Sequence, residues 1–308
     1  MSEKNRGKPV IFGEILFDVF PDGEEALGGA PFNVAWSLKG FGYDPLIISR
    51  IGEDALGKKI LTAMTQWGLD PSGVQIDPAH PTGQVRVSIH NGEPSFDITP
   101  NVAYDFIDNE TAINLVGSVP PLIYHGALAA RGGVSRKALL GLKSEYDSPV
   151  FVDVNLRPPW TPLPLLGSLV SGARYVKVNR DELMEITGAS IPEGEDLTKL
   201  ALGLRRDWKL DALVVTNGDK GAMMVEESGA VEGAPWRVEQ VVDTVGAGDA
   251  FCAVVIMGLM SGWEKAKILD RALEFAASVC RLKGAVTRNA KHYSGIVERW
   301  RGEDEERG

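Results

Sequence analysis

Short apolar segments that favour β-strands alternate with helix-forming segments along most of this 308-residue chain, and this alternation is the strongest constraint on its fold. The pattern is typical of an α/β protein, in which helices pack on both faces of a mostly parallel central sheet. The predicted strands are residues 10–12, 46–49, 122–125, 150–154, 175–178 and 212–216. The predicted helices are residues 33–39, 56–67, 136–146, 182–187, 197–207, 248–262 and 266–282.

One region departs from the alternation. Residues 84–99 predict a β-hairpin, because apolar residues alternate on one face and Asn91-Gly92 supplies a tight turn. A hairpin inserted into an α/β protein is a candidate lid over a binding site. No repeat or linker divides the chain, so we predict a single domain, residues 1–308, with a small β lid around 84–99. Part of residues 14–28 is left open as an extension of that lid.

The composition argues against several classes of function. A formal net charge of −10 disfavours nucleic acid and anionic membranes as partners, since both repel an acidic surface. Cys252 and Cys280 lie in apolar stretches, which favours small buried side chains over a disulfide or metal ligands. The four histidines lack metal-ligand spacing. Residues 1–8 are polar and no apolar run approaches about 18 residues, so we expect a soluble, cytoplasmic protein.

Residues 243–251 are the segment most suggestive of catalysis, and they stand just before a long apolar helix. Gly246 and Gly248 let backbone N–H groups turn toward a ligand, and the helix start adds a positive dipole end. Together they predict a hole for an anion such as a transferring phosphoryl group. Asp249, in the first helical turn, is then placed to accept a proton from an attacking hydroxyl. The alternative is a carboxylate that only stabilises the helix N-terminus, and the segment alone supports both interpretations.

Two common nucleotide-binding motifs are absent from the sequence. Phe251 occupies the third glycine position of a Rossmann fingerprint, and no strand–glycine turn opens a βαβ unit near the N-terminus. The chain also contains no match to the P-loop pattern, so a dehydrogenase or a P-loop enzyme is disfavoured.

A second segment of interest is residues 28–35, which read Gly-Gly-Ala-Pro-Phe-Asn-Val-Ala. Gly28 and Gly29 allow a polyol to approach the backbone, and Asn33 offers a donor and an acceptor to its hydroxyls. The alternative is a helix entry with Asn33 as the N-cap, and taken alone this segment favours that alternative.

The two segments together resemble the signatures of one enzyme family. Residues 243–251 resemble the C-terminal signature of the PfkB sugar kinases, and residues 28–35, with Gly42 and Gly52 downstream, resemble the N-terminal signature. The resemblance extends over residues 10–286. It implies a ribokinase-like α/β fold with a β lid, and transfer of the γ-phosphate of ATP to a sugar hydroxyl. Asp249 is then the catalytic base, and the backbone of Gly246, Ala247 and Gly248 is the anion hole.

Residues 153–157, Asp-Val-Asn-Leu-Arg, follow a predicted strand and fit the same family. Asp153, Asn155 and Arg157 alternate, so we predict that all three side chains point toward one site. Strand ends of this kind line the ligand crevice of open α/β sheets. The segment resembles the Asp-x-Asn-x-Arg of fructokinases and 2-keto-3-deoxygluconate kinases, which places Arg157 near the sugar. The alternative is a surface arginine before a Pro-Pro loop.

The resemblance assigns the remaining sugar contacts. Asp18, close after Gly13-Glu14, matches the family's early aspartate, and a carboxylate accepts two hydrogen bonds from a diol. Only nine residues separate Asp18 from Gly28, which implies a small lid and leaves a lid-mediated homodimer open. The predicted substrate-binding residues are Asp18, Gly28, Gly29, Asn33, Arg157, Asp243 and Asp249.

The nucleotide and metal contacts are predicted from two further turns. Residues 179–182 resemble the family's Asn-x-x-Glu motif, which implies that Glu182 holds Mg²⁺ through water; the alternative is a capping box. Residues 216–221 resemble the turn that faces the nucleotide phosphates; the alternative is an ordinary Asn-Gly hairpin turn. The predicted ATP contacts are Asn179, Thr216, Gly218, Gly221, Gly246 and Gly248. A monovalent cation such as K⁺ is left open.

The sequence favours fructose as the sugar, because Asp18 suits a neutral polyol better than an acid sugar. Two alternatives within the family are a 2-keto-3-deoxygluconate kinase and a kinase of another sugar or a nucleoside. A non-catalytic, sugar-binding regulatory relative is a further alternative, although a pure binding protein has no need of Asp249 beside an anion hole. The expected partners are thus a small sugar and ATP.

Overall fold

The computed structural model describes residues 7–90, 93–192 and 196–307. The predicted Asn91-Gly92 turn lies outside the described residues. No helix in the described ranges is long and apolar enough to cross a membrane. Cys252 is buried and Cys280 is half-buried, and both are free thiols.

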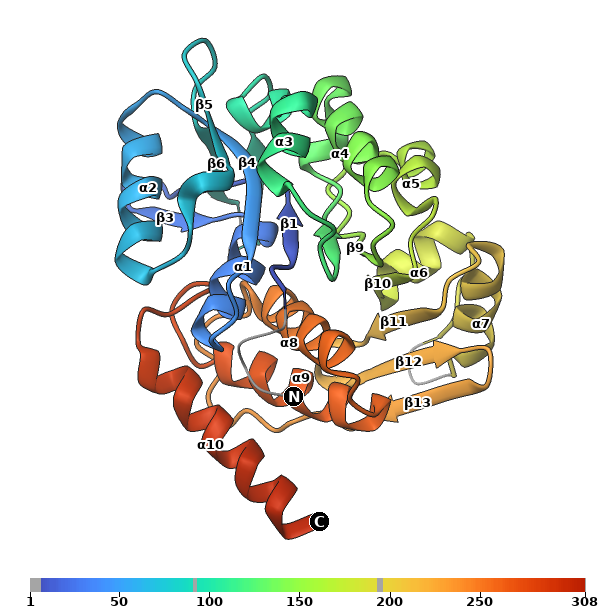
Figure 1. The fold of residues 1–308 in the computed structure, drawn as a ribbon. Coiled ribbons are helices and arrows are strands. Elements are labelled where there is room, and N and C mark those ends of the chain that lie inside the picture. The colour runs from blue at the N-terminus through green and yellow to red at the C-terminus, as the bar shows by residue number, and fades with distance from the viewer. Residues whose placement is uncertain (1–6, 91–92, 193–195, 308) are drawn as a thin grey trace.

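The centre of the protein is a sheet in which nine described strands run in the order β13-β12-β11-β10-β9-β8-β1-β4-β5 (Figure 1). All neighbouring strands are parallel except at β11–β12 and β12–β13, which are antiparallel. The predicted mostly parallel α/β sheet is therefore confirmed. The strands are β1 (Val10–Phe12), β4 (Leu46–Gly52), β5 (Val74–Asp77), β8 (Ile123–His125), β9 (Val150–Asp153), β10 (Tyr175–Asn179), β11 (Ala212–Thr216), β12 (Ala222–Glu226) and β13 (Gly229–Gly233).

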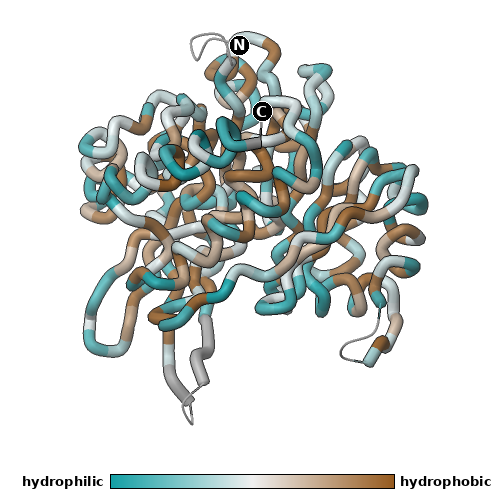
Figure 2. Tube along the Cα trace, turned by 90° about the horizontal axis from the view of Figure 1, so that it is seen from below, coloured by the Kyte–Doolittle hydropathy of each residue, from teal (hydrophilic) through white to brown (hydrophobic). Residues whose placement is uncertain are grey.

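Alternate side chains of these strands enter two separate cores, one on each face of the sheet. In β1, Ile11 packs into the first core, whereas Val10 and Phe12 pack into the second. The first core is covered by α1 (Ala30–Gly40), α2 (Ala55–Trp67), α8 (Ala247–Ser261), α9 (Lys265–Val279) and α10 (Ala290–Arg307). The second is covered by α3 (Asn109–Val116), α4 (Gly133–Glu145), α5 (Leu163–Val170), α6 (Arg180–Thr187) and α7 (Thr198–Asp207). In Figure 2 hydrophobic segments run through the middle of the molecule, and hydrophilic segments lie mostly along its outline.

A second sheet of four described strands, which we call the small sheet, leans against the N-terminal half of the protein. It has the order β3-β2-β6-β7, formed by β3 (Glu25–Gly28), β2 (Leu16–Val19), β6 (Gly83–His90) and β7 (Glu93–Ile98). Strands β6 and β7 are the antiparallel pair predicted from residues 84–99. Strand β2 joins them by pairing in parallel with β6, and β3 pairs antiparallel with β2. The small sheet is therefore built from two segments that are distant in the sequence.

Several elements differ from the sequence-based expectations. Helix α1 begins at Ala30 with Gly29 as its N-cap, so the alternative interpretation of Asn33 as an N-cap is wrong. Helix α10 was not predicted, because it is mostly polar and its few buried side chains lack a long apolar period. Helices α3 and α5 are only eight residues long, which is too short for a clear period.

A buried carboxylate ties α10 to the body of the protein. Glu274 on α9 accepts hydrogen bonds from the indole N–H of Trp300 and from the guanidinium of Arg299, at 2.8 Å. The Arg271 guanidinium lies over the rings of Trp263 and Trp300, 4.7 and 5.0 Å from their centroids. The polar C-terminal helix is thus held by charge-assisted contacts as well as by apolar burial.

We expect Glu274→Ala to lower the free energy of unfolding by about 2–4 kcal/mol, because it leaves a buried indole N–H and a guanidinium without their acceptor. Thermal or denaturant unfolding measures this loss. The exposed Glu298 on α10 is the matched control, and Glu298→Ala should change stability by no more than about 0.5 kcal/mol. Equal effects of the two variants would contradict the anchoring role of Glu274.

Candidate active site

The predicted site residues gather at the edge of the main sheet where the parallel strands end. Strands β1, β9, β10 and β11 run in the same direction, so their carboxyl ends share this edge. Ligands of open α/β sheets bind outside such edges. The N-terminus of α8 also lies here, because a hydrogen bond joins Asn33 on α1 to Asp249 on α8.

The backbone at the start of α8 leaves N–H groups for an anion. Gly246, the N-cap, has a φ of 80°, and a β-carbon there would lie 2.4 Å from that of Ala285, so no other residue fits. The first helical hydrogen bond runs from Ala250 N–H to the Gly246 carbonyl at 2.8 Å. The N–H groups of Gly248 and Asp249 precede it and therefore have no acceptor within the helix. The N–H of Ala247 turns instead toward the Thr244 carbonyl, at 3.3 Å.

Asp249 is a carboxylate of raised basicity. Burial raises the pKa of Asp249 to about 6, and the nearby Asp153 adds to the shift. The hydrogen bond from Asn33 Nδ2 to Asp249 Oδ2, at 2.8 Å, lowers this pKa in part. Such a group is ionised at neutral pH and is still basic enough to take a proton from a hydroxyl.

Gly29 sets the position of Asn33. Its φ is 108°, and a β-carbon at Gly29 would lie 2.5 Å from the carbonyl oxygen of Glu14. Helix α1 therefore starts close against the turn that follows β1. Asn33 then falls within the first turns of α1, where it is buried and directed at Asp249.

Lys177 is a component of the site that the sequence analysis missed. Its ammonium donates to Asp153 Oδ1 at 2.9 Å, and both side chains are buried. A β-carbon on Gly248 would lie 3.6 Å from Lys177 Nζ, so the ammonium stands beside the N–H groups of α8. Burial lowers the pKa of Lys177, but the Asp153 carboxylate more than offsets this and holds the pKa above its usual value. A lysine inside the otherwise apolar strand β10 is the sequence feature that could have indicated a buried, functional charge.

The predicted alternation of residues 153–157 is wrong. Strand β9 ends at Asp153, and Asn155 has a φ of 39°, so the backbone leaves the extended conformation before Arg157. The Asp153 side chain is directed at Lys177, and its Oδ2 lies 3.6 Å from Cys252 Sγ. Arg157 is nevertheless close to the site, because its charge lowers the pKa of Asp18 and Asp249.

Two further acids stand on the other side of this edge. Burial raises the pKa of Asp18 to about 6, and a β-carbon on Gly28 would lie 3.1 Å from Asp18 Oδ2. Burial also raises the pKa of Glu14 to about 7, with a contribution from Asp249. Glu14 Oε2 is buried and has no hydrogen-bond partner. The sequence analysis named Glu14 beside Asp18 but gave it no role.

Asn179 and Glu182 form the capping box that the sequence allowed. Asn179 Oδ1 accepts from the N–H of Glu182 at 2.8 Å, and Glu182 Oε2 accepts from the N–H of Asn179 at 2.7 Å. Glu182 Oε1 also accepts from the N–H of Leu156 at 2.7 Å, which ties α6 to the turn after β9. Burial raises the pKa of Glu182.

The donor set does not form a dedicated metal cage. Within the described ranges, no three histidine, cysteine or acidic residues lie close enough to hold an ion together. Both oxygens of Glu182 accept backbone N–H bonds, and Asp153 is paired with Lys177. This donor set fits a Mg²⁺ that is carried mainly by phosphate oxygens and water, as this cation prefers.

The predicted nucleotide turn joins β11 to β12 after Thr216. The N–H of Asn217 donates to the Gly221 carbonyl at 2.9 Å, and residues 217–221 connect two antiparallel strands by a loop longer than a two-residue Asn-Gly turn. Gly218 begins a short 3₁₀ turn that is exposed to solvent. Gly221 packs closely against β13, because a β-carbon there would clash with the Gly233 carbonyl.

Asp243 is occupied by backbone partners. Its Oδ1 accepts from Val245 N–H at 3.0 Å and its Oδ2 accepts from Gly284 N–H at 3.1 Å. Asp243 therefore fastens the loop before α8 to the segment that contacts Gly246. This arrangement supports the geometry of the α8 N-terminus.

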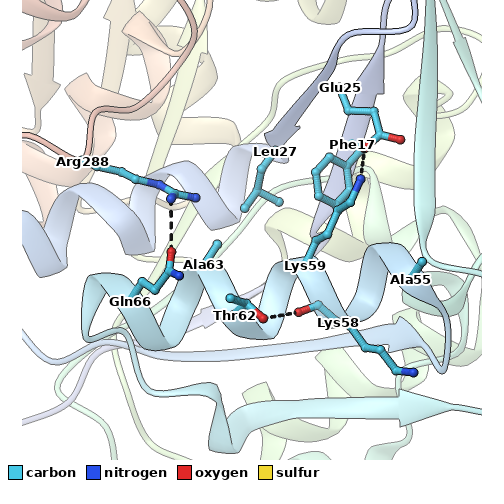
Figure 3. Close-up of a pocket in the computed structure, with 10 residues that line it drawn as sticks. All are labelled: Phe17, Glu25, Leu27, Ala55, Lys58, Lys59, Thr62, Ala63, Gln66 and Arg288. Atoms are coloured by element: carbon cyan, nitrogen blue, oxygen red, sulfur yellow. Dashed lines mark hydrogen bonds and ion pairs between the residues drawn. The ribbon is translucent and has the colours of Figure 1, made fainter.

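A separate hollow of about 460 Å³ lies on the opposite face of the small sheet (Figure 3). Phe17 and Leu27 form part of its wall, and they alternate along their strands with Asp18 and Gly28. Ion pairing between Lys59 and Glu25, at 2.6 Å, links α2 to β3 across this hollow. None of the predicted site residues lines it, so the small sheet separates it from the candidate active site.

Comparison with known proteins gives the family. The pfkB family carbohydrate kinases match residues 19–291 of the chain. The chain belongs to this family. It is therefore a phosphotransferase that acts on a sugar hydroxyl.

Relatives agree with this assignment. The chain is 29% identical to probable fructokinase-5 of Arabidopsis thaliana, over 90% of this chain and 92% of the relative. It is 29% identical to a fructokinase of Klebsiella pneumoniae, over 82% and 84%.

Solved structures confirm the predicted ribokinase-like fold. Fructokinase from Xylella fastidiosa with bound ATP superimposes with a TM-score of 0.82 at 19% identity, over 96% of this chain and 99% of that one. Fructokinase from Vibrio cholerae with fructose, ADP and calcium superimposes with a TM-score of 0.78 at 23% identity, over 95% and 100%.

We expect Asn33→Ala to move the acid limb of the pH profile of kcat/KM to higher pH. The amide hydrogen bond stabilises the Asp249 carboxylate, so its loss lets Asp249 take up a proton at higher pH. Activity at neutral pH should fall roughly tenfold or more, as for a lost hydrogen bond to a charged group. Asn114→Ala, at an exposed position of α3, is the control. An unshifted acid limb would refute this role.

Proposed function

We propose that this enzyme transfers the γ-phosphate of ATP to a hydroxyl of a neutral ketohexose, fructose. The observation that carries the proposal is the Asp249 carboxylate, hydrogen-bonded to Asn33 beside the free N–H groups of α8. The names of the relatives support both the reaction and the sugar. ATP as donor is supported by the nucleotide-bound structures that share the fold.

Asp249 acts as the general base in this proposal. It accepts the proton of the attacking hydroxyl, whose oxygen bonds to the γ-phosphorus while the bond to the β,γ-bridging oxygen breaks and ADP leaves. The turn at Gly246, Ala247 and Gly248 presents the free N–H groups of Gly248 and Asp249 to the negative charge that develops on the transferring phosphoryl group. Lys177 adds a fixed positive charge beside Gly248, and its pairing with Asp153 keeps it protonated.

The sugar lies between α1, the small sheet and the turn after β9 in this arrangement. Asp18 and Asn33 bond its hydroxyls, and the backbone of Gly28 and Gly29 lets it approach closely. Arg157, on the turn after β9, contacts the side of the sugar that faces this turn. Asp243 contributes by holding the loop before α8, through its bonds to backbone N–H groups.

The nucleotide lies along the ends of β10 and β11. Asn179, Thr216, Gly218 and Gly221 face its phosphates, together with the N-terminus of α8. Glu182 would hold Mg²⁺ through water, and the ion would supply positive charge to the phosphates. The small sheet acts as the lid, because its strand β2 bears Asp18, which contacts the sugar. Closure of the lid excludes water, which competes with the sugar as a phosphoryl acceptor.

Asp249→Asn should lower kcat by roughly 10²–10⁴, the usual contribution of a positioned general base. ATP affinity should change little, because the N–H groups of α8 remain. Steady-state turnover and nucleotide titration measure the two effects. Asp207→Asn, an exposed acid on α7, is the control. Near-normal turnover by the Asp249 variant would remove it as the base.

The sugar assignment is tested by ADP release with fructose, 2-keto-3-deoxygluconate and nucleosides. We expect fructose to be preferred over the sugar acid by about a hundredfold or more, since Asp18 repels a carboxylate that is desolvated beside it. Faster turnover of the sugar acid would overturn fructose as the substrate. It would leave the kinase chemistry intact, because that rests on Asp249 and α8.

A further inference from the structure

Acidic groups outnumber basic ones around the proposed sugar pocket. Glu14 follows β1 and is buried, whereas Asp18 on β2 and Asp249 at the start of α8 are half-buried. Arg157 is the cation whose charge acts on all three acids. Its guanidinium also donates to the Leu156 carbonyl at 3.0 Å, which fixes it at one side of the pocket.

The other charges near the pocket are already paired. Lys177 is bound by Asp153 at 2.9 Å. Arg131, which lies near Glu14, is held by both oxygens of Asp105, at 2.8 and 2.9 Å. These two pairs are each neutral overall. Within the described part of the chain, the charges of these three acids are thus offset by the Arg157 guanidinium, and the pocket carries excess negative charge when they are ionised.

The three acids do not converge on a single point. No three acidic, histidine or cysteine residues in the described part of the chain are grouped closely enough to hold a metal ion. Gly29 stands between Glu14 and the pocket, since a β-carbon at Gly29 would be 3.4 Å from Glu14 Cγ. Glu14 therefore acts on the pocket through its charge. Asp18 and Asp249 stand on separate elements. The excess charge is thus spread around the proposed sugar site, and an organic cation bearing hydroxyl groups can compensate it while bonding to more than one element.

We propose that the sugar pocket binds polyhydroxylated ammonium compounds, amino or imino analogues of the sugar, more tightly than neutral compounds of the same shape. The proposal rests on the proposed function only in taking this pocket as the sugar site. A ring ammonium can donate a charge-assisted hydrogen bond to the Asp18 or Asp249 carboxylate, whereas the ring oxygen of a neutral compound has no proton to donate. It also compensates charges that burial otherwise disfavours.

A matched pair of ligands tests this inference. In 2,5-anhydromannitol a ring oxygen stands where 2,5-dideoxy-2,5-iminomannitol has a protonated nitrogen, and both mimic the furanose ring of fructose. Calorimetric titration of the full-length protein without ATP measures binding without turnover. We expect the imino compound to bind on the order of tenfold or more tightly, a gain typical of one added charge-assisted hydrogen bond.

Two controls separate this effect from general electrostatics. Asp18→Asn should remove most of the preference for the imino compound. Glu306→Gln removes one exposed charge near the end of α10, far from the pocket (Figure 1), and should leave the preference unchanged. Lowering the pH from about 7.5 to about 5.5 should also shrink the preference, because the acids take up protons while the ring nitrogen remains charged.

Three results would overturn the inference: equal affinity for the two ligands, an unchanged preference in Asp18→Asn, or abolition of the preference by added K⁺. The last would mean that a small ion already neutralises these acids. The outcome is independent of the substrate panel. If no sugar releases ADP and the imino compound still binds more tightly, the proposed function fails and this inference stands.

Discussion

The buried ion pair between Asp153 and Lys177 is the interaction on which the catalytic edge of the sheet depends. It joins the ends of β9 and β10 and brings an ammonium group beside the first turn of α8. A lone buried charge at either position is strongly unfavourable, whereas the pair is tolerated because each partner satisfies the other. The pair thus supplies a fixed positive charge at the anion-binding helix end without leaving an unpaired one.

The same burial that fixes this pair makes the neighbouring acids reactive. Glu14, Asp18 and Asp249 all have raised pKa values, and burial is the largest cause in each case. A solvated aspartate is a weak base, so withdrawal from water is what gives Asp249 its basicity. Burial of these ionised acids is unfavourable for folding, and the same burial raises their basicity. Ligand hydroxyls that bond these carboxylates relieve part of that unfavourable energy.

Much of the fold was predictable because the main strands and longer helices have strong apolar patterns. The glycine-rich start of α8 and Asp249 were predictable because glycine and acid types at that spacing have few other uses. Lys177 was missed because its role depends on tertiary pairing with Asp153. The alternation expected through Asn155 failed because a left-handed residue interrupts the strand, and asparagine tolerates that conformation. Strands β2 and β3 carry a weak pattern, and their pairing is set by β6.

The pairing of β2 with β6 has a consequence for the order in which the chain folds. Leu16 lies opposite Gly83, and β4, α2 and β5 all lie between them in the sequence. Contacts of such long range form late, because the intervening chain must first be ordered. Strands β1, β4 and β5 pair over shorter separations, so we expect this part of the central sheet to form before β2 meets β6, whereas the β1–β8 pairing spans a longer separation still. The strands of the small sheet bury Phe17 in the first core and Leu16, Val85 and Ile98 in the second, so opening the small sheet exposes core side chains as well as the site.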